Sequence, residues 1–205
     1  MSPNRVFLLS PANCGGERAR LIFDDSARFD LARRVRTRRG APLGEVFAFL
    51  SGLYFRGKLA YALSFARPPE GCKGVLVITP TDGLRPAHAP IGIEGLRRFA
   101  SVDISRGDAR YTTPLLRDAH RLARRMGPRC ELVLLGSVAT AKYVDVLAPV
   151  FGERLRFPSE FVGRGDMSRG GLLLRCVDAG RELEYVPVAG ATRRGPRPPR
   201  LEPRA

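Results

Sequence analysis

Short apolar runs alternate along this chain with longer segments in which apolar residues recur at helical spacing. Three runs, at residues 5–9, 74–79 and 131–136, are bounded by turn formers and predict buried strands. A shorter run at 155–157, just before Pro158, predicts an edge strand. Strands that alternate with helical segments are typical of an α/β domain built on a mostly parallel sheet.

Helical spacing predicts five helices around these strands, at residues 24–39, 42–50, 53–65, 111–126 and about 137–148. The first begins with acidic residues and ends with basic ones, which suits the helix dipole. Thr113 and Ser137 are the expected N-caps of the last two helices. The second and third are joined through Ser51 and Gly52 and resemble a helix hairpin.

The C-terminal part predicts two further features. Residues 171–177 and 182–188 are expected to form a β-hairpin that turns at 178–181. From residue 189 onward the chain is rich in Arg, Pro and Gly, which predicts a disordered basic tail. We therefore expect one α/β domain over residues 1–188, a mixed and mostly parallel sheet flanked by helices, followed by a tail at 189–205.

Composition agrees with one domain, because 205 residues of which 44% are apolar can bury a single core. The net charge is +15, and nearly all of it is arginine, since only Lys58, Lys73 and Lys142 are lysines. A GC-rich genome gives this bias without selection for nucleic acid. A charge of this size still attracts polyanions, so nucleic acid, DNA rather than RNA, is the expected macromolecular partner.

The four cysteines are far apart and form no C-x-x-C pair, so reduced and mostly buried thiols are expected and no metal site is assigned. The first residues lack the apolar run of a signal peptide, and no segment has the length of a membrane span. These features predict a cytoplasmic protein without a membrane partner.

Polar residues gather where the predicted parallel strands end, and ligands of open α/β sheets bind at such ends. The hydroxyl of Ser137 there serves either as an ordinary helix cap or as part of an anion site. A glycine-rich loop at 161–171 adds arginines that match phosphate or carboxylate, although a solvated loop before a strand has the same composition. The expected ligand-binding residues are Ser10, Asn13, Thr79, Arg85, Arg164 and Arg169.

Carboxylates are better candidates for acid–base work than the two histidines, His88 and His120. The chain has no G-x-S-x-G elbow and no Walker loop, which argues against the common hydrolases and nucleotide triphosphatases. The expected catalytic residues are Asp82, Ser137 and Asp166.

Four short motifs occur in one order: Leu8-Leu-Ser-Pro-Ala12, Asp82-Gly-Leu-Arg-Pro86, Leu134-Leu-Gly-Ser-Val-Ala139 and Arg164-Gly-Asp-Met-Ser-Arg169. In this order they resemble the peroxide-stress protein YaaA family, over about residues 6–175. The resemblance implies an α/β fold that binds DNA through a helix-hairpin-helix-like element and limits oxidative damage. The chain departs from that family at Asn13, where the family has lysine.

Residues 50–60 are the best match to such an element, although a plain helix–helix turn fits equally well. The residues expected to meet phosphate are Arg33, Arg34, Arg56 and Lys58. The leading hypothesis is therefore a DNA-binding protein linked to oxidative stress. The alternative is an enzyme that acts on a nucleobase, nucleoside or small metabolite in a strand-end pocket, and a basic module without chemistry is the third. The sequence does not show whether a cofactor is used or which one.

Overall fold

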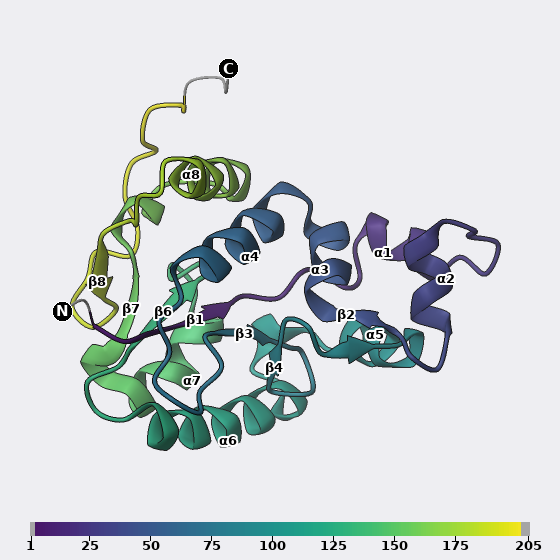
Figure 1. Cartoon of the computed structure of the whole chain (residues 1–205), viewed down its shortest axis with the longest axis horizontal. Coiled ribbons are helices and arrows are strands. Elements are labelled where there is room, and N and C mark those ends of the chain that lie inside the picture. Colours follow the sequence, from purple (N-terminus) through teal and green to yellow (C-terminus); the bar gives the residue numbers. More distant parts are fainter. Residues whose placement is uncertain (1–2, 202–205) are drawn as a thin grey trace.

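The apolar runs of the sequence form the centre of one sheet. Its strands are β1 (Arg5–Leu9), β3 (Val75–Ile78), β4 (Leu84–Pro86), β6 (Glu131–Leu135), β7 (Leu155–Pro158) and β8 (Tyr185–Pro187). The computed structural model describes residues 3–201, and it orders the strands β4-β3-β1-β6-β7-β8 (Figure 1). The four inner strands are parallel and the two edge strands antiparallel. The chain is thus a single α/β domain with a mixed, mostly parallel sheet flanked by helices.

Helices cover both faces of this sheet. One core cluster joins the sheet to α1 (Glu17–Phe23), α2 (Asp30–Arg36), α3 (Leu43–Ser51), α4 (Leu53–Phe65), α5 (Ile93–Ala100) and α8 (Asp166–Asp178). A second joins it to α6 (Ala109–Met126) and α7 (Ala141–Phe151). The remaining elements are the strand pair β2 (Ala41–Pro42) and β5 (Pro90–Ile91) and the 3₁₀ turns η1 (Ile104–Arg106), η2 (Gly152–Arg154) and η3 (Ser159–Phe161). Within the described residues, no helix has the length and apolar character needed to cross a membrane.

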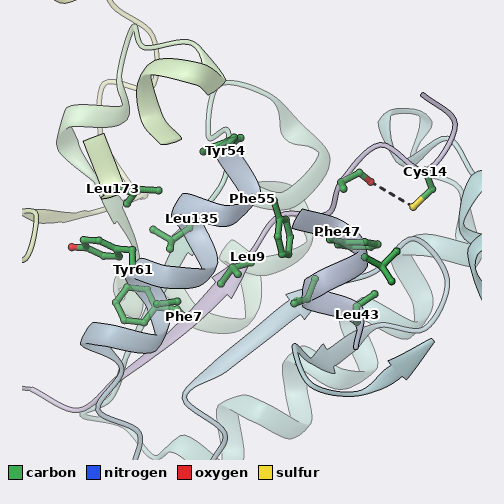
Figure 2. Close-up of a cluster of buried hydrophobic side chains, with 14 of the residues drawn as sticks. Phe7, Leu9, Cys14, Leu43, Phe47, Tyr54, Phe55, Tyr61, Leu135 and Leu173 are labelled. Atoms are coloured by element: carbon green, nitrogen blue, oxygen red, sulfur yellow. Dashed lines mark hydrogen bonds between the residues drawn. The ribbon is translucent and has the colours of Figure 1, made fainter. Parts of the chain in front are cut away.

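Alternate residues of β1 supply the two cores. Phe7 and Leu9 belong to the cluster on the α4 side, whereas Val6 and Leu8 belong to the cluster on the α6 and α7 side. The Phe7 ring packs in a T-shaped arrangement with the Tyr61 ring from α4, with ring centroids 5.8 Å apart (Figure 2). A strand that is apolar on both faces requires helices above and below it, which explains the layered architecture.

Two glycines allow α4 and α8 to approach closely. A Cβ on Gly57 of α4 would lie 2.7 Å from the carbonyl oxygen of Gly170 on α8, and one on Gly170 would lie 2.8 Å from the carbonyl oxygen of Leu53. Larger residues at either position would push backbone against backbone. The two glycines therefore permit a tight helix pair above β1.

Most predicted elements are confirmed. The strands expected at 5–9, 74–79 and 131–136 are present as β1, β3 and β6, and the helices expected at 42–50 and 53–65 are α3 and α4. The strand at 155–157 is also present, but it lies between β6 and β8 and is not an edge strand.

The single basic helix expected at 24–39 is wrong, because α1 and α2 form there with a turn between them. The Asp24 carboxylate ends α1 by accepting hydrogen bonds from the backbone N–H and the hydroxyl of Ser26. Arg36 of α2 then donates to the carbonyl oxygens of Ile22 and Asp24 at the end of α1. These side-chain bonds stabilise the turn at the expense of a continuous helix.

The N-cap expected at Thr113 is also wrong. The helix α6 begins earlier, with Asp108 as its cap and the Asp108 carboxylate accepting from the backbone N–H of Arg110. An aspartate outside the apolar pattern thus extends the helix by a turn, and Pro114 lies inside it.

The C-terminal hairpin is wrong as well, since residues 171–177 belong to the helix α8. Leu172, Leu173 and Cys176 are buried at helical spacing against the α4 side of the sheet, which a strand could not achieve. The second predicted strand is present as β8, which pairs with β7 instead.

The basic tail has no helix or strand at 192–201, as its composition predicts, yet it contacts the domain. Arg164 donates to the Pro199 carbonyl oxygen, and Arg194 donates to the Ala139 carbonyl oxygen. The side chain of Leu201 packs against the core. The part of the expected tail at 202–205 lies outside the described residues.

The glycine contact gives a stability prediction. Replacing Gly57 with alanine places a methyl group against the α8 backbone, so we expect the free energy of unfolding to fall by about 1–3 kcal/mol in urea titrations. Gly171→Ala is the matched control, because its Cβ would meet only the ends of the Arg175 and Leu201 side chains. The control should match the parent or exceed its stability by up to about 1 kcal/mol. Equal stabilities of the two variants would contradict the close packing.

Candidate functional site

The candidate site lies where β1 and β6 end side by side. The connection after β1 leads to β3, whereas the connection after β6 leads to β7 on the opposite side, so a crevice opens between the two strand ends. The backbone N–H of Ser10 donates to the carbonyl oxygen of Leu135 over 3.1 Å. A Cβ on Gly136 would lie 2.9 Å from the Ser10 Cβ, so glycine is required for this close approach.

A cavity of about 640 Å³ opens at these strand ends. Seven parts of the chain line it: the loop after β1, the junction of α3 and α4, the loop after β3, the end of α5 with the segment after it, the loop after β6, the start of α7, and the start of α8. Hydroxyl, amide and aromatic groups dominate its wall. The residues on which the chemistry depends are Ser10, Tyr54, Ser137, Lys142, Tyr143 and Asp166.

The amine of Lys58 is buried directly beneath Ser10. The side chain is 1% exposed, and its Nζ donates to the carbonyl oxygen and to the Oγ of Ser10, both over 2.7 Å. The amine also lies 4.4 Å from the centre of the Tyr54 ring. Burial lowers the pKa of Lys58 to about 7, although the charge of Asp166 opposes this in part. Near neutral pH both forms of the amine are therefore populated.

Two tyrosines complete the polar floor. The hydroxyl of Tyr54 is buried beside the Arg169 guanidinium, and its proton has no acceptor among the described residues. Burial raises the pKa of Tyr54 and that of Tyr143, and for Tyr143 hydrogen bonding to Ser10 offsets this in part. Both phenols stay protonated and can act as donors at physiological pH.

The Cys14 thiol also lines the cavity but is not reactive. It donates to the Ala12 carbonyl oxygen over 3.7 Å (Figure 2), and burial raises its pKa to about 12. The nucleophilic thiolate is thus absent at neutral pH.

The glycine-rich loop of the sequence has become the start of α8, and its arginines bind the protein itself. The Arg169 guanidinium donates to the Phe161 carbonyl oxygen through Nε and Nη2, over 3.2 and 3.0 Å, and lies 3.5 Å from the Asp166 carboxylate. Arg164 donates to the Ser168 hydroxyl. Neither residue lines the cavity, whereas Asp166 does.

Other expected site residues divide into two groups. Ser10, Asn13 and Ser137 line the cavity, as the strand-end rule predicts. Ser137 is not the cap of a helix, however, because α7 begins later with Thr140 as its cap residue.

The second group forms the turn between β3 and β4 and does not line the cavity. Thr79 is buried, and its Oγ1 donates to the Gly83 carbonyl oxygen and accepts from the backbone N–H of Asp82. Asp82 and Arg85 form an ion pair at 3.2 Å. The antiparallel return of the chain into β4 uses these polar groups to close the turn.

The residues expected to bind nucleic acid differ in their exposure and pairing. Arg33 and Arg56 are exposed. Arg34 is paired with Asp30 and Glu45. The assignment of Lys58 to a DNA surface is wrong, because this residue is buried below Ser10.

Lys58 and Tyr54 are the site residues that the sequence reasoning missed. The sequence carried a signal for the burial of Lys58, since it is one of three lysines in an arginine-rich chain and lies on the apolar face of a helix. Nothing in the described residues gathers three His, Cys, Asp or Glu side chains in a way that would hold a metal ion.

Burial of the Lys58 amine predicts a pH-dependent stability. Its pKa is about 7 in the folded chain against an ordinary value of 10.5, so between these values the unfolded chain binds one more proton. The free energy of unfolding should therefore rise with pH, by up to about 1.4 kcal/mol per unit. Denaturation of the parent and Lys58→Met between pH 7 and 9.5 should show this rise only in the parent. Lys73→Met, at an exposed position, should keep it, and parallel curves for parent and Lys58→Met would rule out the lowered pKa.

Comparison of the chain with protein-family models, curated proteins and solved structures found no match. What the chain does must be inferred from the cavity and from the Ser10–Lys58 contact beneath it.

Proposed function

We propose that this protein is an enzyme that acts on a nucleobase, nucleoside or similarly small polar metabolite bound in the strand-end cavity. The observation that carries the proposal is the buried Lys58 amine in contact with Ser10 at the cavity floor. A buried group with a strongly shifted pKa beside a cavity at a topological switch point is a typical mark of an active site.

The wall of the cavity supports this ligand class. Its volume of about 640 Å³ lies within the range of ordinary small-molecule pockets. Tyr54, Phe99 and Tyr143 supply aromatic surface against which a heteroaromatic base can stack, and Asn13 and Ser137 supply groups for its hydrogen-bonding edge. Lys142 adds a positive charge that suits a phosphate substituent.

The proposal predicts ligand-induced stabilisation. Thermal unfolding with a panel of nucleobases, nucleosides and nucleoside monophosphates should raise the Tm for at least one of them. A ligand at 100 times its Kd adds about 2.7 kcal/mol, which is about 5–10 °C for a chain of this size. Ser137→Trp, which fills the cavity, should abolish the shift.

Ser64→Trp is the matched control for this experiment, because Ser64 is exposed on α4 and does not line the cavity. It should keep the full shift. The proposal fails if no compound of the panel raises the Tm, or if Ser137→Trp responds as the parent does.

A second candidate function is DNA binding in the cytoplasm. It is favoured by the net charge of +15 and by the exposed positions of Arg33 and Arg56, and it agrees with the resemblance to the YaaA family and its link to oxidative stress. All four cysteines are free thiols, which is typical of a reducing compartment.

DNA binding through these arginines predicts a defined salt dependence. Affinity for duplex DNA should fall linearly on a log–log plot against salt, and Arg33→Gln with Arg56→Gln should reduce the slope by about 0.9 for each phosphate that the protein no longer neutralises. Arg34→Gln is the control, since Arg34 is already paired with carboxylates. Fluorescence anisotropy across a salt series measures the affinity and its slope. Salt-independent binding, or equal slopes for all variants, would exclude this surface.

A further inference from the structure

Ser10 is the group through which the buried amine reaches the cavity. The Oγ of Ser10 lies 2.7 Å from the Lys58 Nζ, and Ser10 lines the cavity whereas Lys58 does not. We propose that Ser10 is a nucleophile for which Lys58 is the general base, and that the cavity takes a small ester or amide. The inference rests on the proposed function, because it assumes that the same cavity binds the substrate.

The choice of Ser10 follows from its neighbours. The Lys58 amine is enclosed by Ser10 and by the rings of Tyr54 and Phe55, so a substrate carbon cannot reach it directly. The Cys14 thiol also lies on the wall nearby, and it is protonated at neutral pH. A serine hydroxyl becomes a nucleophile when a neutral base accepts its proton, and serine–lysine pairs are one known arrangement.

Lys58 has the properties that a general base requires. Because burial lowers its pKa to about 7, a large share of Lys58 is neutral at physiological pH and can accept a proton. Its contact with the Ser10 carbonyl oxygen fixes the position of the amine. Among charged groups, Asp166 favours the protonated amine, whereas Arg169 and Lys142 favour the neutral form.

The Tyr54 hydroxyl is the candidate donor for the oxyanion. It is buried and lines the cavity. The neighbouring Arg169 guanidinium, which acts to lower its pKa, can only donate, so the phenol proton has no acceptor among the described residues. Burial raises the pKa of Tyr54, so the group keeps its proton. A buried donor without an acceptor costs free energy in the resting protein, and a negatively charged oxygen in the cavity would satisfy it.

The reaction is balanced without a cofactor. The Ser10 Oγ bonds to the substrate carbonyl carbon as its proton passes to the Lys58 Nζ, and the carbonyl oxygen becomes an oxyanion. The bond to the leaving alcohol or amine then breaks as Lys58 returns the proton to it, which leaves an ester on Ser10. Water attacks this ester, again with Lys58 accepting its proton, and Ser10 leaves with that proton as the carboxylic acid is released.

An alkyl fluorophosphonate tests the nucleophile directly, since attack by the Ser10 Oγ on phosphorus releases fluoride and leaves a stable adduct. Peptide mapping by mass spectrometry of the folded parent should place the adduct on Ser10. Lys58→Met should slow labelling by about 10²–10⁴-fold and remove a pH inflection near 7. Tyr54→Phe should slow it by about 10²–10³-fold. Ser51→Ala, which changes another hydroxyl on the same wall, should label as the parent does.

The labelling and Tm experiments test the Ser10 nucleophile and the proposed ligand class separately. Absence of an adduct on Ser10, or labelling of Lys58→Met at the parental rate and with the parental pH profile, overturns the nucleophile. If the nucleoside panel still raises the Tm in that case, the proposed cavity function stands alone. An adduct on Ser10 without any nucleoside-induced shift keeps the nucleophile and excludes the ligand class.

Discussion

The close contact between α4 and α8 at Gly57 and Gly170 is the constraint on which the candidate site depends. It allows α4 to lie along β1, so that one face of the helix follows the strand from its middle to its end. Tyr61 meets Phe7 within the strand, and Lys58, one turn earlier, meets Ser10 just beyond it. The packing of two helices thereby determines which side chain lies under the crevice between β1 and β6.

A lysine at this place is difficult to explain by stability alone. An aliphatic side chain of similar length would fill the same space without the cost of removing an amine from water. The amine makes two hydrogen bonds to Ser10 and lies over two aromatic rings, yet its pKa is still lowered, which shows that the charged form remains less favourable there than in water. This cost of burying an amine next to a cavity is the physical basis of the proposed catalytic role.

The sheet was predictable from the sequence because parallel strands buried on both faces appear as continuous apolar runs. The same argument misplaced residues 171–177, since an apolar run preceded by glycines also fits a helix that packs closely on another helix. Ser10, Asn13 and Ser137, which the strand-end rule selected, line the cavity. Asp82 does not line the cavity, because β3 is followed by the antiparallel strand β4 and the polar groups of Thr79 and Asp82 form the turn between them. The role of Lys58 depends on tertiary burial, which charge patterns along the chain do not encode.

Net charge is a weak guide to the site of this protein. Several of its arginines bind groups of the protein itself. Arg36 donates to the Ile22 carbonyl oxygen, Arg169 donates to the Phe161 carbonyl oxygen, and Arg34 is paired with two carboxylates. These guanidinium groups are already engaged within the protein and are less available for direct contact with a polyanion, although the net charge of +15 already counts their acidic partners. The cavity wall, in contrast, carries phenols and hydroxyls together with Lys142, Asp103 and Asp166, and the partly uncharged Lys58 amine lies beneath it in contact with Ser10. On the proposed function a small polar molecule would bind in this cavity, and nucleic-acid binding at the surface would proceed by separate residues.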